Sequence, residues 1–384
     1  MSQEVKKSGR NPSLDVLRIF AFLLVVSVHF GSLSKYNQMA TGGLMMLLMT
    51  MVRAVTICCV PIFIMLTGYL QTNKTVSAKF YGGILRPGIT YILAALVCLI
   101  YKIKVYAYPS DIPNIVGRIL NFTASDYGWY MEMYFGLFLM IPFLNAAYHG
   151  MKNQKQKLIL IASFLFLTAI PPILNTFNFV ADGWWAMPSL NRTYNKLIPE
   201  WWVSIYPITY YFIGSYLREY PLKLNKWVNL LLIGGSAALI GAYNFYRLRG
   251  SEFFYGAFLN EGSLLTLTVS VLLFSFIAER DMRSLPSPVQ KILSTVSGWT
   301  LAAYLVSQLF DVMFYPKYIE AFPVMSDRVK HAPIIVLAVF FCSLILGGII
   351  DSLYRLAAFL IGMIPGKKKV LQTKNIKIPE DTKV

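Results

Sequence analysis

Charged side chains are scarce in this chain of 384 amino acids: only 14% are Asp, Glu, Lys or Arg, whereas 56% are hydrophobic. Soluble globular domains carry about 25% charged residues. The mean hydropathy of +0.55 points the same way. This composition excludes a soluble globular protein and predicts an all-α, polytopic membrane protein.

Cysteine is also scarce, with only four in the chain: Cys58, Cys59, Cys98 and Cys342. All four fall in apolar segments, and their spacing is not that of metal ligands. We therefore expect no metal site and interpret the cysteines as packing residues. They do not indicate a redox compartment.

Acidic residues are few, 18 against 35 Lys and Arg, which leaves a net charge of +17. The basic residues gather in alternate connections, namely around Lys6 to Arg18, Lys74 to Arg86, Lys152 to Lys157, Arg218 to Lys226, Arg280 to Lys291, and after Arg355. Basic residues mark the cytoplasmic side of membrane proteins, so we expect both termini in the cytoplasm. The charge then faces anionic membrane lipid, and no nucleic-acid partner is needed to explain it.

Apolar runs of about membrane-spanning length recur along the chain and predict about ten transmembrane helices. They cover residues 15–34, 54–70, 87–101, 129–147, 158–176, 202–217, 228–246, 263–278, 293–314 and 333–352. No cleavage pattern directly follows the first run, so we interpret it as a retained span. We expect one membrane domain over residues 1–365 and a basic, disordered cytoplasmic tail over 366–384, in a multi-pass protein of the cytoplasmic membrane.

Two ionisable residues fall inside the first expected span. Arg18 is costly there, about 2.5 to 3.5 kcal/mol at the centre of a membrane helix, and such residues are functional candidates by default. His29 is one of three histidines and the only one within a span. Eleven residues of helix separate the two side chains by about 16 Å and return them to one face. The pattern predicts a permanent cation near one membrane surface and a titratable base, of a type suited to neutral pH, towards the other.

Four short motifs carry a family resemblance. The first is Asp15-Val-Leu-Arg18, then ten residues and His29-Phe30-Gly31; the others are the runs Val60–Leu70, Trp129–Pro142 and Pro207–Gly214. Together they resemble the acyltransferase-3 family of integral membrane acyltransferases, whose opening signature is an Arg, ten residues and a His. The resemblance covers nearly the full length, with the same ten-span plan.

The resemblance implies acyl transfer, most often of acetyl, from cytoplasmic acyl-CoA to a hydroxyl of a carbohydrate outside the membrane. The carbohydrate acceptor would be a glycan of the cell envelope or surface, in some cases linked to lipid. Arg18 is then the expected ligand of coenzyme A phosphates, because a guanidinium forks onto phosphate. His29 is the expected general base, with the donor's pantetheine arm running between them along Phe22 and Val25. Trp129 and Tyr130 are expected at the substrate.

A carboxylate often orients a catalytic base. Glu132 is the first candidate, with a glutamate exposed at the interface as the alternative. Glu261 and Asp311 are weaker candidates at the expected outer ends of two later spans. Asp15 is expected to form a local ion pair that orients Arg18.

Two departures from the family pattern concern the binding residues. The family commonly has two arginines three residues apart after the second span; here Arg86 matches the second, and Gly83 replaces the first. Lys79 is expected to substitute as a donor-binding charge, although Lys79 and Arg86 are equally explained as ordinary basic residues of the inner face. In the ninth span Ser307 stands where many members have a histidine, and Gln308 is a possible replacement.

Three alternatives remain at this stage. A transporter or flippase of a lipid-linked glycan also needs broken helices and intramembrane polar groups, but it has no need of a base on the arginine's helix face. A catalytically inactive acyl-CoA sensor is compatible with Gly83 and Ser307. The tryptophans of the loop from Asp182 to Trp202 are either an interfacial aromatic belt or a platform for a sugar ring.

Overall fold

The computed structural model describes residues 11–39, 42–180, 183, 195–248 and 257–360. Within these ranges the chain forms helices and no strand, which confirms the all-α prediction. Eight helical segments are long and apolar enough to cross a membrane: Ser13–Leu33, Gly43–Gln71, Ala78–Tyr106, Trp129–Gly150, Gln154–Leu174, Lys226–Leu248, Ser287–Ala321 and Met325–Leu360. The protein is therefore a multi-pass membrane protein.

The other two expected spans are present as shorter helices. α10 (Tyr206–Glu219) has 14 residues and α12 (Leu264–Ala278) has 15, fewer than the roughly 20 that a straight crossing needs. Most of their side chains are buried against other helices. Eight long segments and two short internal helices thus account for the ten expected runs. The expected tail over 366–384 lies outside the described residues.

Several of the long segments consist of two helices. They are α2 (Gly43–Thr56) with α3 (Cys59–Gln71), α4 (Ala78–Gly82) with α5 (Leu85–Tyr106), and α8 (Gln154–Thr168) with α9 (Pro171–Leu174). The break between α2 and α3 lies at Ile57 and Cys58, four and three residues before Pro61. A proline ring clashes with the carbonyl four residues earlier, which explains the break there. Pro142 remains inside α7 (Trp129–Gly150), and Pro207 occupies the first turn of α10, where proline is tolerated.

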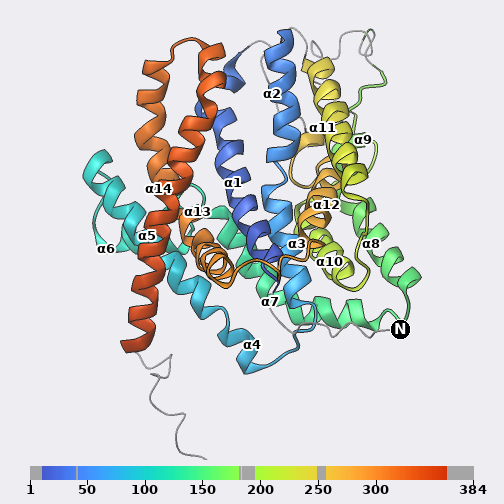
Figure 1. Ribbon diagram of the computed structural model, residues 1–384, viewed down its shortest axis with the longest axis horizontal. Helices are drawn as coiled ribbons and strands as arrows, with labels where there is room; N and C mark the ends of the chain where they lie inside the picture. The colour runs from blue at the N-terminus through green and yellow to red at the C-terminus, as the bar shows by residue number, and fades with distance from the viewer. Residues whose placement is uncertain (1–10, 40–41, 181–182, 184–194, 249–256, 361–384) are drawn as a thin grey trace, which may run out of the picture.

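α1 (Ser13–Leu33) occupies the centre of the bundle (Figure 1). It contacts α2, α3, α12, α13 (Ser287–Ala321) and α14 (Met325–Leu360). α11 (Lys226–Leu248) packs on α2 at one side, and the short α6 (Ile112–Leu120) lies beyond α5 at the other. Because neighbours surround α1, its polar side chains face protein rather than lipid, as intramembrane ionisable residues require.

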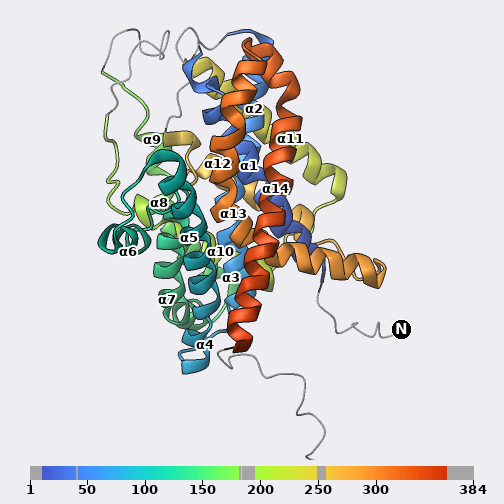
Figure 2. The same ribbon diagram turned by 90° about the vertical axis from the view of Figure 1, so that its left-hand side faces the viewer.

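α14 runs the full height of the bundle (Figure 2) and carries an apolar stripe on its outer face. Exposed side chains recur every three or four residues along it: Ile334, Leu337, Phe341, Ile345, Ile349, Leu353, Leu356 and Leu360. This spacing places them on one side of the helix. They form the surface that lipid tails would cover.

The basic connections gather at one end of the bundle. Residues 72–77, 151–153, 220–225 and 279–286 join helices in the lower half of the view in Figure 1, towards the end at which α14 finishes. We call this the basic end and the opposite one the far end. That the basic end faces the cytoplasm stays a prediction from the charge pattern.

Two glycines explain the close packing of α3 against α10. A side chain at Gly68 would collide with the backbone carbonyl of Tyr211, and one at Gly214 with that of Met65. Small residues let membrane helices approach until their backbones touch. Both glycines belong to the sequence motifs described above, and their role here is packing.

We expect Gly214→Ala to destabilise the protein, because even one methyl group has no room at this contact. Overpacking of this kind costs about 1–3 kcal/mol, seen as a lower Tm in a thermal unfolding assay in detergent. Gly136→Ala in α7 is the matched control, since a side chain there meets no atom within 4 Å. A Tm that falls equally in both variants would contradict the packing explanation.

Candidate active site

α1 carries Arg18 and His29 on one unbroken helix, so their predicted separation along the axis holds. Arg18 lies towards the basic end and His29 towards the far end. Leu17, Ala21, Phe22 and Val26 are fully buried on the same helix. This packing fixes the helix, and therefore the two functional side chains, relative to their neighbours.

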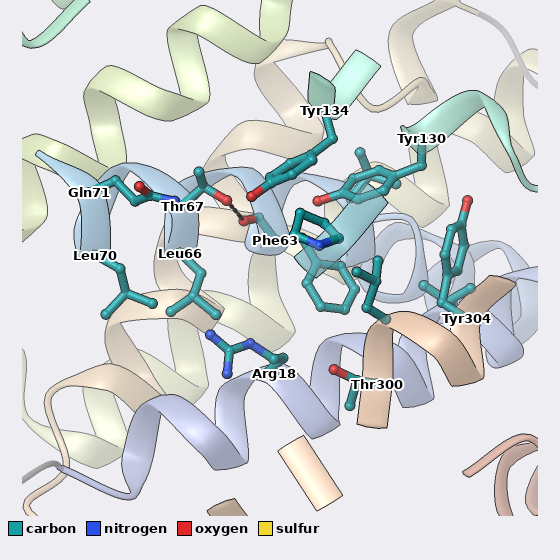
Figure 3. Close-up of a pocket in the computed structure, with 14 residues that line it drawn as sticks. Arg18, Phe63, Leu66, Thr67, Leu70, Gln71, Tyr130, Tyr134, Thr300 and Tyr304 are labelled. Atoms are coloured by element: carbon teal, nitrogen blue, oxygen red, sulfur yellow. Dashed lines mark hydrogen bonds between the residues drawn. The ribbon is translucent and has the colours of Figure 1, made fainter. Parts of the chain in front are cut away.

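A cavity of about 190 Å³ opens beside Arg18. Side chains of α1, α3, α7 and α13 enclose it, with Pro87 of α5 at its edge. Figure 3 shows Arg18 on one wall, the hydroxyls of Tyr130 and Tyr134 on the opposite wall, and Tyr304 at one end. Most of the remaining lining is apolar, including Val25, Val60, Phe63 and Leu66. The cavity thus suits a ligand that is largely carbon and has one anionic part.

Two partners orient the Arg18 side chain. Its Nη1 donates a hydrogen bond to Ser297 Oγ at 2.8 Å and lies 3.8 Å from Asp15 Oδ1. The ion pair expected between Asp15 and Arg18 is therefore present. Asp15 is buried, whereas 27% of the Arg18 side chain is exposed towards the cavity. The side chain of Arg18 therefore forms part of the cavity wall.

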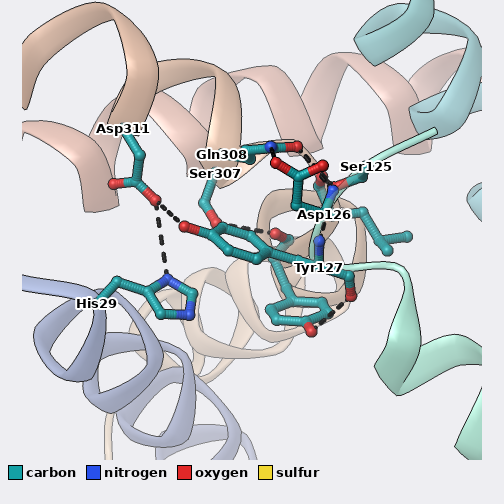
Figure 4. Close-up of polar contacts among 9 residues, drawn as sticks. His29, Ser125, Asp126, Tyr127, Ser307, Gln308 and Asp311 are labelled. Carbon is teal, nitrogen blue, oxygen red and sulfur yellow. Dashed lines mark hydrogen bonds and ion pairs between the residues drawn. The ribbon is translucent and has the colours of Figure 1, made fainter. Parts of the chain in front are cut away.

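His29 lies beside a buried carboxylate at the far end of the same helix. Its Nδ1 is 3.7 Å from Oδ2 of Asp311, a residue of α13 whose side chain is 1% exposed (Figure 4). The imidazole also stacks on Tyr127, with 4.1 Å between ring centroids. The Tyr127 hydroxyl donates to the same Asp311 oxygen at 2.6 Å. His29, Asp311 and Tyr127 form one cluster, which we call the His29 cluster.

A turn before α7 holds Tyr127 in the His29 cluster, and α13 holds that turn. The Asp126 backbone N–H donates to Gln308 Oε1 at 2.9 Å, and the Gln308 amide donates to the Asp126 carboxylate. Ser125 Oγ donates to the Leu305 carbonyl at 2.9 Å. The Tyr304 hydroxyl donates to the Tyr127 carbonyl at 2.7 Å. One face of α13 therefore positions both Asp311 and the ring that stacks on His29.

The His29 cluster has spare hydrogen-bonding capacity. Within the described ranges, His29 Nδ1 and Asp311 Oδ1 are buried and have no hydrogen-bond partner. The 3.7 Å separation of His29 from Asp311 exceeds hydrogen-bond length, but catalytic contacts often shorten only when substrates bind. A proton on Nδ1 directed at Asp311 would leave Nε2 as the proton acceptor.

Glu132 does not reach His29. It is exposed on α7, while its neighbours Tyr130 and Met131 are buried. One residue of helix rotates a side chain by about 100°, so the burial of Met131 turns Glu132 outward. The carboxylate beside His29 is Asp311, the weaker sequence candidate. Glu261 is part-exposed, and its backbone carbonyl accepts a hydrogen bond from the Tyr210 hydroxyl.

The two expected donor-binding cations after the second span lie outside the cavity lining. Arg86 pairs with Asp351 at 3.2 Å, and 56% of its side chain is exposed. Its neighbour Pro87 lines the cavity, so Arg86 stands close to the cavity edge. Lys79 is exposed on α4, and Gly83 lies in the turn between α4 and α5.

The aromatic candidates divide between cavity and surface. Tyr130 lines the cavity, and Trp129 packs edge-on against it with 42% of its surface exposed. Trp201 and Trp202 are exposed near the far end, at 89% and 54%. Trp184 and Trp185, which the sequence grouped with them, lie outside the described residues.

One further expectation, that Phe22 lies along the donor path, needs correction. Val25 lines the cavity, but Phe22 does not, because its ring is buried against Phe340 at 5.2 Å. Ser307, which stands where many family members have a histidine, is fully buried and donates to the Tyr304 carbonyl of its own helix at 2.9 Å. Gln308 instead has a positioning role, through the turn that carries Tyr127.

Comparison with known proteins gives one match. The model of the acyltransferase-3 family, described as an acyltransferase domain, matches residues 11–352, which include Arg18, the cavity lining and the His29 cluster. No curated protein and no solved structure matches the chain.

Proposed function

The chain belongs to the acyltransferase-3 family, and we propose that this membrane transferase moves an acyl group from cytoplasmic acyl-CoA to a hydroxyl of a cell-envelope glycan. The observation that carries the proposal is the layout of α1. Arg18 lines a mostly apolar cavity, and His29 stands outside its lining, next to Asp311. An anion site and a base at opposite ends of one helix suit a donor and an acceptor that arrive from opposite sides.

The donor would enter from the basic end. Its phosphates would pair with Arg18, whose guanidinium stays charged and forks onto phosphate oxygens. The pantetheine arm would lie along Val25, Phe63 and Leu66, where burial of its carbon atoms is favourable. The acyl group, small enough to pass with the arm and most simply acetyl, would point towards the far end.

Two tyrosines of the cavity lining, Tyr130 and Tyr304, connect through Tyr127 to His29. Tyr130 meets Tyr304 edge-on at 5.6 Å, Tyr304 lies 6.1 Å from Tyr127, and Tyr127 stacks on His29. The thioester would lie against these rings to reach the base. The rings would also keep water away from the thioester, so that transfer to the glycan is favoured over hydrolysis.

The chemical step needs one proton acceptor and no covalent acyl-enzyme. In the proposed step His29 Nε2 takes the proton of a sugar hydroxyl while that oxygen attacks the thioester carbonyl carbon. The carbon–sulfur bond then breaks and coenzyme A leaves as the thiol after taking up the proton. Asp311 would stabilise the imidazolium that forms in between, as a carboxylate does for a charged histidine. Holding donor and acceptor together supplies much of the rate.

The proposal is tested by reconstituting the full chain with labelled acetyl-CoA and a panel of cell-envelope glycans. Label recovered on a glycan hydroxyl, dependent on acetyl-CoA, is the expected result. A glycan flippase would instead move label-free glycan across the bilayer without transferring acetyl. Glycan translocation without acyl transfer would overturn the proposal.

Removing the cation tests the donor site. We expect Arg18→Ala to raise KM for acyl-CoA about 10- to 100-fold, because a charge-assisted contact to phosphate is worth about 1.5–3 kcal/mol. The KM of Arg18→Lys should lie between those of the wild type and Arg18→Ala, since lysine keeps the positive charge but cannot form two parallel hydrogen bonds to phosphate. Arg283→Ala at the basic end is the control: Arg283 pairs with Asp281 on the surface. An unchanged KM for acyl-CoA in Arg18→Ala would contradict the assignment.

A further inference from the structure

A second cavity, with several polar and charged residues in its lining, lies at the basic end and is separate from the proposed active site. It has a volume of about 190 Å³ and lies between the α10–α11 connection, α11 and the end of α12. Its lining includes Asn229, Ser275, Glu279, Lys223 and Arg280. None of these five residues lines the cavity beside Arg18.

The inner wall of this cavity holds two buried oxygens that need partners. Asn229 and Ser275 are each only 3% exposed. Within the described part of the chain, Asn229 Oδ1 and Ser275 Oγ have no hydrogen-bond partner. A buried polar atom left unpaired costs about 1–3 kcal/mol, and an amide oxygen can only accept. The wall therefore favours a ligand group that donates hydrogen bonds.

The mouth of the cavity carries charges of both signs. Burial raises the pKa of Glu279 above its ordinary value, and Lys223 opposes that shift. Glu279 is exposed at this mouth and has no ion pair within 4 Å among the described residues, so its carboxylate can pair with a cationic ligand group. Lys223 and Arg280 stand on the same rim and favour an anionic group next to the cationic one.

The position of the cavity is that of a lipid headgroup. It lies where the apolar helices α11 and α12 meet a polar connection, and Trp227 in the first turn of α11 is 68% exposed with Lys226 over its ring at 5.0 Å. Tryptophan and lysine at a helix end mark the membrane interface. Basic pockets between membrane helices at this level bind lipid headgroups.

We propose that this cavity binds the phosphoethanolamine group of a membrane phospholipid. The ammonium donates to Asn229 Oδ1, Ser275 Oγ and the Glu279 carboxylate, and the phosphate pairs with Lys223 and Arg280. Such a group carries three N–H donors and an adjacent phosphate, which matches the acceptors of the wall and the cations of the rim.

The nucleotide end of coenzyme A fits this cavity less well. Adenine needs a free ring face to stack on, and the one aromatic lining residue, Phe276, already has the Arg280 guanidinium 4.8 Å from its ring centroid. The Glu279 carboxylate would also repel three phosphates. The lipid proposal therefore stands apart from the proposed acyl transfer and does not depend on it.

Lipid binding to the full chain in detergent, followed by native mass spectrometry, tests the proposal. Phosphatidylethanolamine should bind about 10-fold more tightly than phosphatidylcholine or phosphatidylglycerol of the same chains, because neither offers N–H donors. Glu279→Gln and Ser275→Ala should each remove most of this preference. Glu320→Gln, an exposed glutamate at the far end, should keep it.

The contrary outcomes are distinct. Equal binding of the three lipids to the wild type, or a preference that survives in both Glu279→Gln and Ser275→Ala, would overturn the proposal. So would coenzyme A binding that falls in these variants while lipid binding does not. Competition by soluble phosphoethanolamine would support recognition of the group itself, and tighter binding of the lipid would identify the membrane as its source.

Discussion

Replacing His29 with alanine is expected to lower kcat for acyl transfer by about 10²- to 10⁴-fold, the usual contribution of a general base. The fall should appear in kcat rather than in KM for acyl-CoA, because the donor site at Arg18 lies near the other end of α1. Single-turnover transfer of labelled acetyl to the acceptor measures the chemical step directly.

His331→Ala is the matched control for His29→Ala. His331 stacks on Phe322 with 4.3 Å between ring centroids, and its Nδ1–H donates a hydrogen bond to the Asp327 carbonyl at 2.8 Å. The His331→Ala variant also removes a histidine side chain near the far end, but it leaves the His29 cluster unchanged. Unchanged acyl transfer in a folded His29→Ala protein would remove the base from the mechanism while leaving the family membership intact.

Helix existence could be predicted from the sequence because long apolar runs have few alternatives in a membrane protein. The ten expected runs all correspond to helices. The short runs 202–217 and 263–278 correspond closely to α10 and α12, whereas α13 and α14 extend beyond the runs 293–314 and 333–352 that predicted them. Helix ends depend on tertiary contacts that hydropathy does not contain.

The relation between Arg18 and His29 was also predictable, because a single helix fixes both spacing and face. The residues that contact His29 could not be predicted in the same way. Glu132 and Asp311 are both acidic residues in apolar runs, and only the rotation of α7 and α13 within the bundle decides which one meets His29. Tyr127 carried no signal at all, since it precedes a helix by two residues and acts through a turn held by Gln308.

Kinetics of variants can decide whether Asp311 or Glu132 is the carboxylate that acts with His29. Asp311→Asn is expected to lower kcat by about 10²-fold, because breaking a buried charge pair costs at least about 3 kcal/mol and 1.36 kcal/mol is a factor of ten in rate. The loss should arise in the chemical step, when His29 gains a positive charge. KM for acyl-CoA should stay nearly unchanged. The Asn side chain keeps the shape and still accepts the Tyr127 hydroxyl, so the variant tests the charge of Asp311 alone.

Glu132→Gln is the paired variant for Asp311→Asn, since it also replaces a carboxylate by an amide, at the exposed position on α7. We expect acyl transfer near the wild-type rate there, because no part of Glu132 meets the His29 cluster. The rate of acyl transfer in Tyr127→Phe should lie between those of the two variants, because this change keeps the ring on His29 and removes only the 2.6 Å hydrogen bond to Asp311. A larger loss of kcat in Glu132→Gln than in Asp311→Asn would indicate that Glu132, and not Asp311, orients His29. It would also mean that the helix turns relative to α1 when both substrates are bound, because the present rotation keeps Glu132 away from His29.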